Sequence, residues 1–499
     1  MTRERQLALA LGLSGASGAA VLAATMEPGL GLAAFLGVLG AYAVWRAPVR
    51  TTFLGLMFLA LTVENPAERP FAAQWQSPLF RLGEVLFTGL HHQVPLPFLR
   101  VSGMELLLLV LAGVVLARKA WGLTVEPAPL AAPKPLARAL VLSFAAVLAL
   151  EAWGLWRGGD VKQSLFQMRT LLFTPVVAAL GLYALRGRED VVVVGKVLVL
   201  AATYRALLGA YFARVVAWPH QVWPPYVTTH TDTVLFSLAL LVLAARWWEA
   251  PTPGRLGEAV GWGLPILYGL YLNDRRLAWV TVAAGLAALY LVSPWNRARR
   301  FVTRAALVAL PVLLAYGVVG WNSGRSVFRP VQAVKTVVAP EPYGTSADTS
   351  TEFRVLENFN LVQTWRESPL VGSGFGHEYR EVVPLPDISR FMPDYRYLPH
   401  NGVLWLLGVG GVLGFSALFL YLPVGVFFAV RGYHAAVRPD ERALLLVGLA
   451  AVIAYLNQAY GDMGTQSYTS VWTLAPLLAL AGQLASSSLA PIGGEEQSA

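Results

Sequence analysis

Pro399-His400-Asn401-Gly402-Val403-Leu404-Trp405 marks the boundary between a long polar stretch and a long apolar run of the sequence. Shortly before it lies Pro369-Leu370-Val371-Gly372-Ser373-Gly374-Phe375-Gly376, a glycine-rich turn. A histidine and an amide are costly at the edge of a membrane, because polar groups at that depth need hydrogen-bonding partners. The boundary therefore indicates a membrane-spanning helix that begins at a functional loop.

The composition is that of a protein whose surface is largely apolar. The 499 residues are 56% hydrophobic and 13% charged, and the mean hydropathy is +0.55, whereas soluble domains carry roughly 25% charged residues. Outside one loop, no polar block is long enough for a large soluble domain. The chain contains no cysteine, which excludes disulfides, thiolate catalysis and cysteine-ligated metal.

Apolar runs along the whole chain predict an all-α polytopic membrane protein with about 12 to 14 transmembrane helices. The candidate spans cover residues 7–26, 29–45, 51–63, 102–117, 138–156, 171–185, 190–212, 231–247, 259–273, 277–293, 301–320, 400–430, 442–460 and 469–486. They divide the chain into a transmembrane bundle (1–320), one large loop (321–399), C-terminal transmembrane helices (400–486) and a disordered acidic tail (487–499). A loop of this length is usually functional.

Basic residues predict the orientation of these spans. When the N-terminus is placed in the cytoplasm, the cytoplasmic segments hold about twice as many Lys and Arg residues as the short outer segments. Both termini are therefore expected in the cytoplasm, and the 321–399 loop outside. The net charge of +9 then reflects cytoplasmic anchoring, and no nucleic-acid partner is expected. Within the loop, Asp348-Thr349-Ser350 offers N-caps for a helix that Ser368-Pro369 ends.

Asn273-Asp274-Arg275-Arg276-Leu277-Ala278-Trp279 forms a tight turn between two spans on the outer side. Two adjacent arginines on the outer side are contrary to the positive-inside bias, which suggests that they have a specific role. A guanidinium pair suits a diphosphate, which it can bind through bidentate charge-assisted hydrogen bonds. An ion pair between an arginine and Asp274 that closes the turn is an equally good interpretation.

Three further groups on the outer side each allow a functional and a structural interpretation. Arg354 either contacts a ligand or is a solvated residue of the loop helix. The glycines of the 369–376 turn either cradle a phosphate or form a backbone turn that packs closely against the bundle, and packing is favoured. His400, beside Asn401, is either a base near neutral pH or a histidine hydrogen-bonded to the backbone at a helix start.

Other polar residues give weaker indications. His230 and Asp232 lie at the outer mouth of a span, where they line a pocket or cap a helix, and capping is favoured. Lys196 and Arg205 are the clearest charged residues within a span, which suits a transporter. His91-His92 has no third ligand at metal-binding spacing, so no metal site is expected there.

Taken together and in this order, the motifs resemble the O-antigen ligase and O-antigen polymerase superfamily of bacterial inner-membrane glycosyltransferases. The family's Ser-Arg-Gly turn corresponds to Arg275-Arg276-Leu277, and its loop arginine to Arg354. Its Pro-Leu-x-Gly-x-Gly-x-Gly turn is 369–376, and its His-Asn at a helix start is His400-Asn401. The resemblance is clear over about residues 260–420. The Glu often found within the family's helix after His-Asn is absent, because Trp405-Leu406-Leu407-Gly408 follows.

The resemblance implies a GT-C-like bundle in the bacterial inner (cytoplasmic) membrane, with its active site on the periplasmic face. It implies an undecaprenyl-diphosphate-linked glycan as donor and a sugar hydroxyl, on a glycan or on lipid A-core, as acceptor. The catalytic residues would be His400, Arg276 and Arg354, and the substrate-binding residues would be Arg275, Asn401, Gly374, Gly376 and Trp279. No cofactor, metal or nucleotide sugar is expected.

Two alternatives stay open on the sequence. Transfer by a ligase and transfer by a polymerase use the same donor and differ only in the acceptor. A polytopic transporter, similar to the bicarbonate- or solute-transporter members of the superfamily, is the alternative to an enzyme. The enzyme is favoured because the polar residues collect on one side of the membrane and the sequence shows no internal repeat.

Overall fold

The described part of the chain is helical throughout. The structure, a computed structural model, describes residues 3–66, 77–93, 100–123, 130–221, 227–339, 348–390, 392, 394–461, 465 and 467–489. Within these ranges every regular element is a helix and no β-strand occurs, which confirms the predicted all-α class. The helices belong to two compact units, Met1–Pro129 and Leu130–Ala499.

The first unit is built around closely packed small residues. A side chain at Gly18 would meet the carbonyl oxygen of Gly31 at 2.9 Å, and a side chain at Gly31 would meet that of Gly18 at 2.9 Å. Such glycine contacts let two membrane helices approach at backbone distance. The unit comprises α1 (Arg3–Thr25), α2 (Pro28–Arg46), α3 (Val49–Thr62), α4 (Phe80–Phe87) and α5 (Gly103–Ala120).

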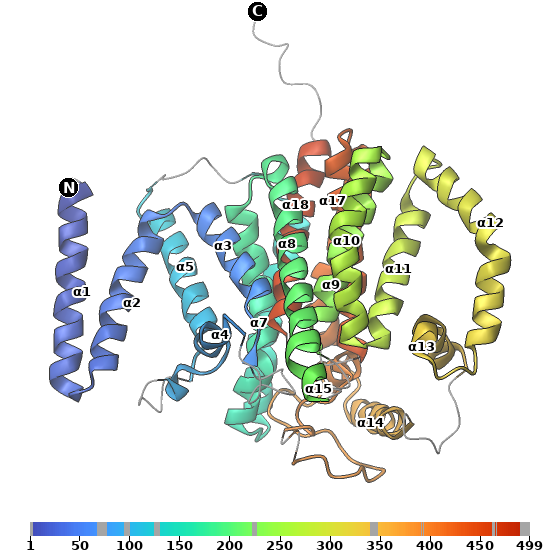
Figure 1. The fold of residues 1–499 in the computed structure, drawn as a ribbon. Coiled ribbons are helices and arrows are strands. Elements are labelled where there is room, and N and C mark those ends of the chain that lie inside the picture. Colours follow the sequence, from blue (N-terminus) through green and yellow to red (C-terminus); the bar gives the residue numbers. More distant parts are fainter. Residues whose placement is uncertain are drawn as a thin grey trace, which may run out of the picture. The chain divides into compact units, whose positions relative to one another are not determined.

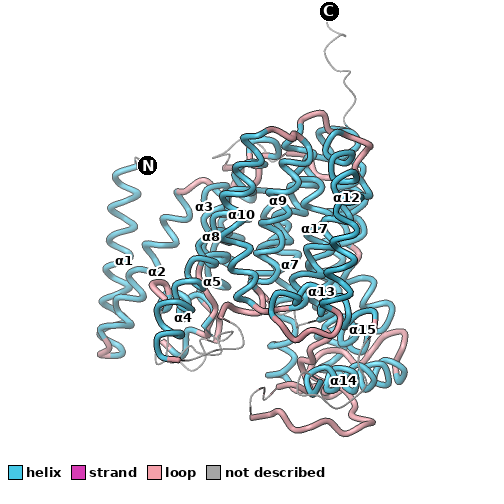
Figure 2. Tube along the Cα trace, turned by 45° about the vertical axis from the view of Figure 1, so that its right-hand side comes forward, coloured by secondary structure: helices cyan, strands magenta, loops and turns pink. Residues whose placement is uncertain are grey.

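The second unit is a bundle of helices with two further helices across one end (Figures 1 and 2). The bundle helices are α6 (Lys134–Trp156), α7 (Val161–Ala184), α8 (Val191–Tyr211), α9 (Asp232–Glu249), α10 (Pro253–Asn273), α11 (Arg276–Val292), α12 (Arg297–Gly320), α15 (Gly402–Phe419), α16 (Tyr421–Ala435), α17 (Pro439–Gly461) and α18 (Tyr468–Leu489). The two helices across the end are α13 (Arg329–Val338) and α14 (Asp348–Glu367). Most of α17 is buried inside the unit, so it forms the centre of the packing.

All the predicted spans fall on helices, and the predicted 400–430 span is divided between α15 and α16. Among the described residues, 8 helical segments are long and apolar enough to cross a membrane, and α3 and α11 are shorter apolar helices. The predicted loop helix is present as α14. The last helix, α18, reaches Leu489 and so extends into the predicted tail, and residues 490–499 lie outside the described residues.

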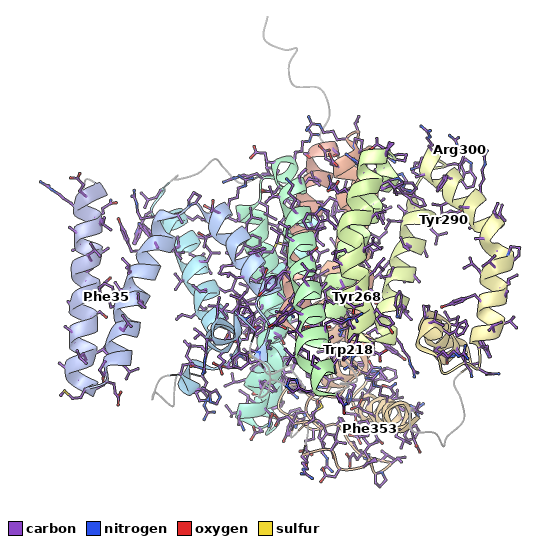
Figure 3. All side chains as sticks on the ribbon, viewed as in Figure 1. Phe35, Trp218, Tyr268, Tyr290, Arg300 and Phe353 are labelled. Carbon is purple, nitrogen blue, oxygen red and sulfur yellow. The ribbon has the colours of Figure 1, made fainter. Side chains whose placement is uncertain are left out.

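Ion pairs gather several helix ends at one end of the second unit. Arg255 pairs with Asp440 at 2.9 Å, and Arg442 pairs with Glu249 at 2.7 Å. The opposite end therefore holds the α6–α7 turn, the α10–α11 turn and the start of α15. In Figure 3, Phe353 on α14 lies at this opposite end, whereas Arg300 lies at the ion-paired end. The orientation of the termini in the membrane stays a prediction.

Candidate active site

The helix that follows His400 is broken, and the glycine-rich turn fills the break. Gly411 has φ 57° and ψ −170°, which interrupts the helical hydrogen bonds of α15. Four backbone hydrogen bonds join the turn to the break: Ser373 N to Gly408 O (3.0 Å), Gly374 N to Val409 O (2.9 Å), Val412 N to Pro369 O (2.8 Å) and Leu413 N to Leu370 O (3.0 Å). Backbone groups left without partners are costly in a membrane, so these bonds fix the turn to α15.

The glycines of this turn are needed for close packing. Gly374 has φ +80°, a conformation that favours glycine, and a side chain there would meet the backbone nitrogen of Gly154 on α6 at 2.3 Å. Gly376 has φ +84°, and its N–H donates to Oε1 of Gln167 at 2.6 Å. The prediction that the turn packs closely against the bundle is confirmed. Contact of Gly374 and Gly376 with a substrate stays a prediction, and their donated N–H groups favour the packing role.

The rest of the loop is held between α7 and α14 by buried amide side chains. Gln167 on α7 donates to the carbonyl of Tyr397 at 2.8 Å. Asn360 on α14 donates to the carbonyl of Val383 at 2.8 Å and accepts from the N–H groups of Val382 and Val383 at 3.0 and 2.9 Å. Both amides are fully buried, so they fix the path of the chain toward His400.

His400 is held by a carboxylate from the loop helix. Glu357 is fully buried on α14, and its Oε2 accepts from the backbone N–H of His400 at 3.1 Å. Its Oε1 lies 3.2 Å from Nδ1 of the same residue. An ionised carboxylate only accepts hydrogen bonds, so Nδ1 carries the proton and Nε2 has the free lone pair. The His400 side chain is 23% exposed, and a role of Nε2 as a base stays a prediction.

Two neighbours on α14 complete the surroundings of the imidazole. The ring of Phe353 packs edge-on against the ring of His400 at a centroid distance of 5.7 Å. Arg354 is half-buried one turn before Glu357, and residues three apart share a helix face. The structure therefore places Arg354 one turn before Glu357 on α14, the helix whose carboxylate contacts His400.

Asn401 caps α15 and joins it to the loop helix α14. Its side-chain oxygen accepts from the N–H of Leu404 at 3.1 Å, which caps the N-terminus of α15. Its side-chain amide donates to Oδ1 of Asn358 on α14 at 2.9 Å. Asn401 is 2% exposed. It therefore joins the loop helix to α15 directly beside His400, while its predicted contact with substrate stays a prediction.

Tyr379 adds a buried hydroxyl near the carboxylate of Glu357. Its side chain is buried, and its hydroxyl has no hydrogen-bond partner among the described residues. Burial and the negative charges of Glu357 and Glu381 raise the pKa of Tyr379 well above its ordinary value, so the hydroxyl keeps its proton. A protonated hydroxyl of this kind is a free hydrogen-bond donor.

The arginine turn lies at the same end of the bundle as His400. A side chain at Gly461, the last residue of α17, would meet Leu277 at 3.1 Å, and one at Gly402 would meet the carbonyl oxygen of Ala459 at 3.1 Å. The starts of α11 and α15 therefore flank the last turn of α17. Arg276 is exposed and makes no ion pair with any residue that the structure describes.

Arg275 and Trp279 are placed on either side of that exposed arginine. Arg275 is the N-cap of α11, and Trp279 lies one turn into the helix, and both are half-buried. Their contact with a substrate stays a prediction.

Glu357 contacts His400, and the sequence did not single it out as a candidate site residue. The family's usual acid after His-Asn is absent, and a carboxylate of the loop helix stands beside the histidine instead. The available signal was weak: Phe353, Glu357 and Asn360 follow at helical spacing, which indicates one face but not what this face contacts.

Comparison with known proteins places the site within a recognised family segment. Residues 263–419 match the family model described as O-antigen ligase. This range runs from α10 to the end of α15 and includes Arg276, Arg354, Glu357 and His400. No curated protein matches the chain. The family match confirms the predicted resemblance over residues 263–419. Together with the 8 described helical segments that are long and apolar enough to cross a membrane, it supports a multi-pass membrane protein similar to O-antigen ligases over this segment.

Proposed function

We propose that this protein transfers a glycan from an undecaprenyl-diphosphate-linked donor to a sugar hydroxyl on the periplasmic face of the inner membrane. The observation that carries the proposal is the pairing of His400 with the buried carboxylate of Glu357, within one turn of Arg354. An imidazole whose tautomer is fixed by a carboxylate is suited to general base catalysis.

The reaction is a direct displacement at the anomeric carbon. The acceptor hydroxyl oxygen forms a bond to that carbon while the bond from the carbon to the diphosphate oxygen breaks. The electron pair of the broken bond goes to the diphosphate, and the hydroxyl proton goes to Nε2 of His400. Glu357 stabilises the resulting imidazolium through Nδ1. Because a single displacement inverts the anomeric centre, the product is expected to have the opposite configuration to the donor.

Arginines would stabilise the charge that develops on the leaving diphosphate. Arg276 is exposed at the end of the bundle where the starts of α11 and α15 meet α17. Arg354 corresponds to the loop arginine of the family pattern, and Arg275 is an additional arginine beside the aligned Arg276. Preorganised positive groups act on charge that grows in the transition state, and one such group supplies about 2.7–4 kcal/mol.

The surface polysaccharide of a deletion strain tests the function and separates its two forms. We expect the strain to lose long surface glycan, and re-expression of the protein to restore it. Core bearing one repeat unit indicates a lost polymerase, whereas bare core with long chains on the carrier lipid indicates a lost ligase. Normal surface glycan in the deletion strain would contradict the proposed function.

Transfer is expected to be independent of divalent metal. In the proposed mechanism, arginine guanidinium groups supply the positive charge that metal-dependent transferases take from a divalent ion. Purified protein treated with EDTA should keep its transfer rate within about twofold, measured with the lipid-linked donor in detergent. Complete loss of the rate, restored by added Mg²⁺ or Mn²⁺, would contradict arginine-only stabilisation.

A further inference from the structure

A buried polar cluster adjoins the arginine turn, because its member Asn273 immediately precedes Asp274 in the chain. It consists of Arg205 on α8, Asp232 and Thr233 on α9, Thr228 and Thr229 before α9, and Asn273 at the end of α10. Each of these side chains is buried, although they lie among apolar helices. Polar groups in such places are costly and mark functional regions of membrane proteins.

The first half of the cluster is an ion pair closed off from solvent. The Nε of Arg205 donates to Oδ1 of Asp232 at 2.7 Å, and the two side chains are 2% and 1% exposed. The other carboxylate oxygen accepts from the N–H of Thr229 at 2.9 Å, and Arg205 also donates to Oγ1 of Thr229 at 3.2 Å. The ion pair therefore fixes the backbone of Thr229 as well as its side chain.

The second half of the cluster links Thr229 to the end of α10. Asn273 is fully buried, and its side-chain amide donates to the carbonyl of Thr229 at 2.8 Å and to Oγ1 of Thr228 at 2.8 Å. Its side-chain oxygen accepts from Oγ1 of Thr233 at 2.9 Å. Thus both donors and the acceptor of this amide are used, and Asn273 has one allowed orientation.

The residues after Asn273 carry the two arginines of the turn. Asp274 adopts the left-handed conformation, with φ 52°, and Arg275 is the N-cap of α11. The direction in which Arg275 and Arg276 leave the bundle therefore depends on how Asn273 is held. The ion pair between Arg205 and Asp232 does not suit a transport role, because its two charges are paired with each other and shielded from solvent.

We propose that Arg205, Asp232 and Asn273 are positioning residues that hold the 274–276 turn in the geometry needed to bind a diphosphate. This inference rests on the proposed function, in which the turn contacts the diphosphate of the donor. It gives the charged pair inside the membrane a role in substrate recognition. The expected signature is a change in affinity for the donor, with no change in affinity for the acceptor.

Thr233→Val tests the inference with a nearly isosteric change. It removes the hydrogen bond to Asn273 and leaves every group of the proposed active site in place. We expect the KM for the lipid-diphosphate donor to rise about tenfold, the value of one hydrogen bond of this kind, while the KM for the acceptor stays within twofold. Thr233→Ser keeps the hydroxyl and should restore the donor KM.

Thr473→Val is the matched control. Thr473 is also fully buried, but among the described residues its hydroxyl bonds within its own helix, to the carbonyls of Thr469 and Ser470. A merely structural loss lowers the active fraction and so moves kcat, but it leaves both KM values unchanged. An unchanged donor KM in Thr233→Val, or an equal rise in Thr473→Val, would overturn the positioning role.

Direct binding of undecaprenyl diphosphate in detergent separates this inference from the proposed function. Weaker binding by Thr233→Val than by wild type and Thr473→Val supports the positioning role even where no glycan is transferred. If the wild-type protein transfers glycan but all three proteins bind undecaprenyl diphosphate equally, the proposed function stands and the positioning role is wrong. If Thr233→Val fails to fold, Thr228→Val removes the other side-chain hydroxyl bonded to Asn273 and is measured in the same way.

Discussion

His400→Ala is expected to lower kcat for glycan transfer by about 10²–10⁴-fold, the usual contribution of a positioned general base. The variant removes the imidazole whose Nδ1 lies 3.2 Å from Oε1 of Glu357, and with it the proposed general base. Its loss takes the imidazole away from Oε1 of the buried Glu357, so the amount of folded protein in the membrane is measured alongside the rate. The measurement is single-turnover transfer from the lipid-linked donor by purified protein.

Two comparisons separate the chemistry from general damage. Glu357→Gln keeps the shape of the side chain but removes the charge that stabilises the imidazolium, so an intermediate loss of kcat is expected. His434→Ala replaces an exposed histidine near the end of α16, away from α14 and α15, and should leave kcat within twofold. If the His400→Ala protein is folded and transfers glycan at the wild-type rate, His400 is not the general base.

Arg276→Ala is expected to lower kcat/KM for the donor by about 10²–10³-fold, as for the removal of one preorganised electrostatic contact. Its guanidinium group is exposed and makes no ion pair with any described residue, so its removal has little structural cost. The loss should therefore occur without a fall in melting temperature. Steady-state kinetics with varied donor concentration, together with a thermal melt in detergent, provide the two measurements.

Arginine replacements elsewhere make this result specific. Arg300 is exposed at the ion-paired end of the unit, so Arg300→Ala removes the same charge from the protein at a distance from the site (Figure 3). Its donor kinetics should match those of wild type. Arg276→Lys keeps the charge but loses the planar fork, so partial activity is expected. Equal kinetics for Arg276→Ala and Arg300→Ala would show that the turn does not contact the diphosphate.

The positions of the helices were predictable because the bilayer fixes the length and composition of a spanning segment. The predicted runs therefore fall on described helices from α1 to α18, although α7 begins at Val161, ten residues before the predicted 171–185 span. The break in α15 was not predictable. Gly411 stands in a uniformly apolar run with several other glycines, and nothing local distinguishes it from Gly408 or Gly414. Its conformation depends on the 369–374 backbone, which meets it only in the folded protein.

The residues of the candidate site were largely predictable from the sequence, whereas the contacts between their side chains were not. The pattern around His400 and the unusual outer arginines pointed to one end of the bundle. The partner of His400 was missed because Glu357 lies far away in the sequence and reads as an ordinary charged residue of a loop helix. Hydrogen bonds between distant side chains, such as that between Asn358 and Asn401, leave no local pattern in the sequence.

The backbone junction between the 369–374 turn and the broken α15 also has a consequence for biogenesis. The turn precedes α15 in the chain, so it is synthesised first, and its groups and those of the break satisfy one another only after both are in place. Insertion of α15 into the bilayer is thus coupled to docking of the polar segment outside. His400 lies just before the same helix, so in the proposed mechanism the general base takes its place in the step that joins the turn to α15.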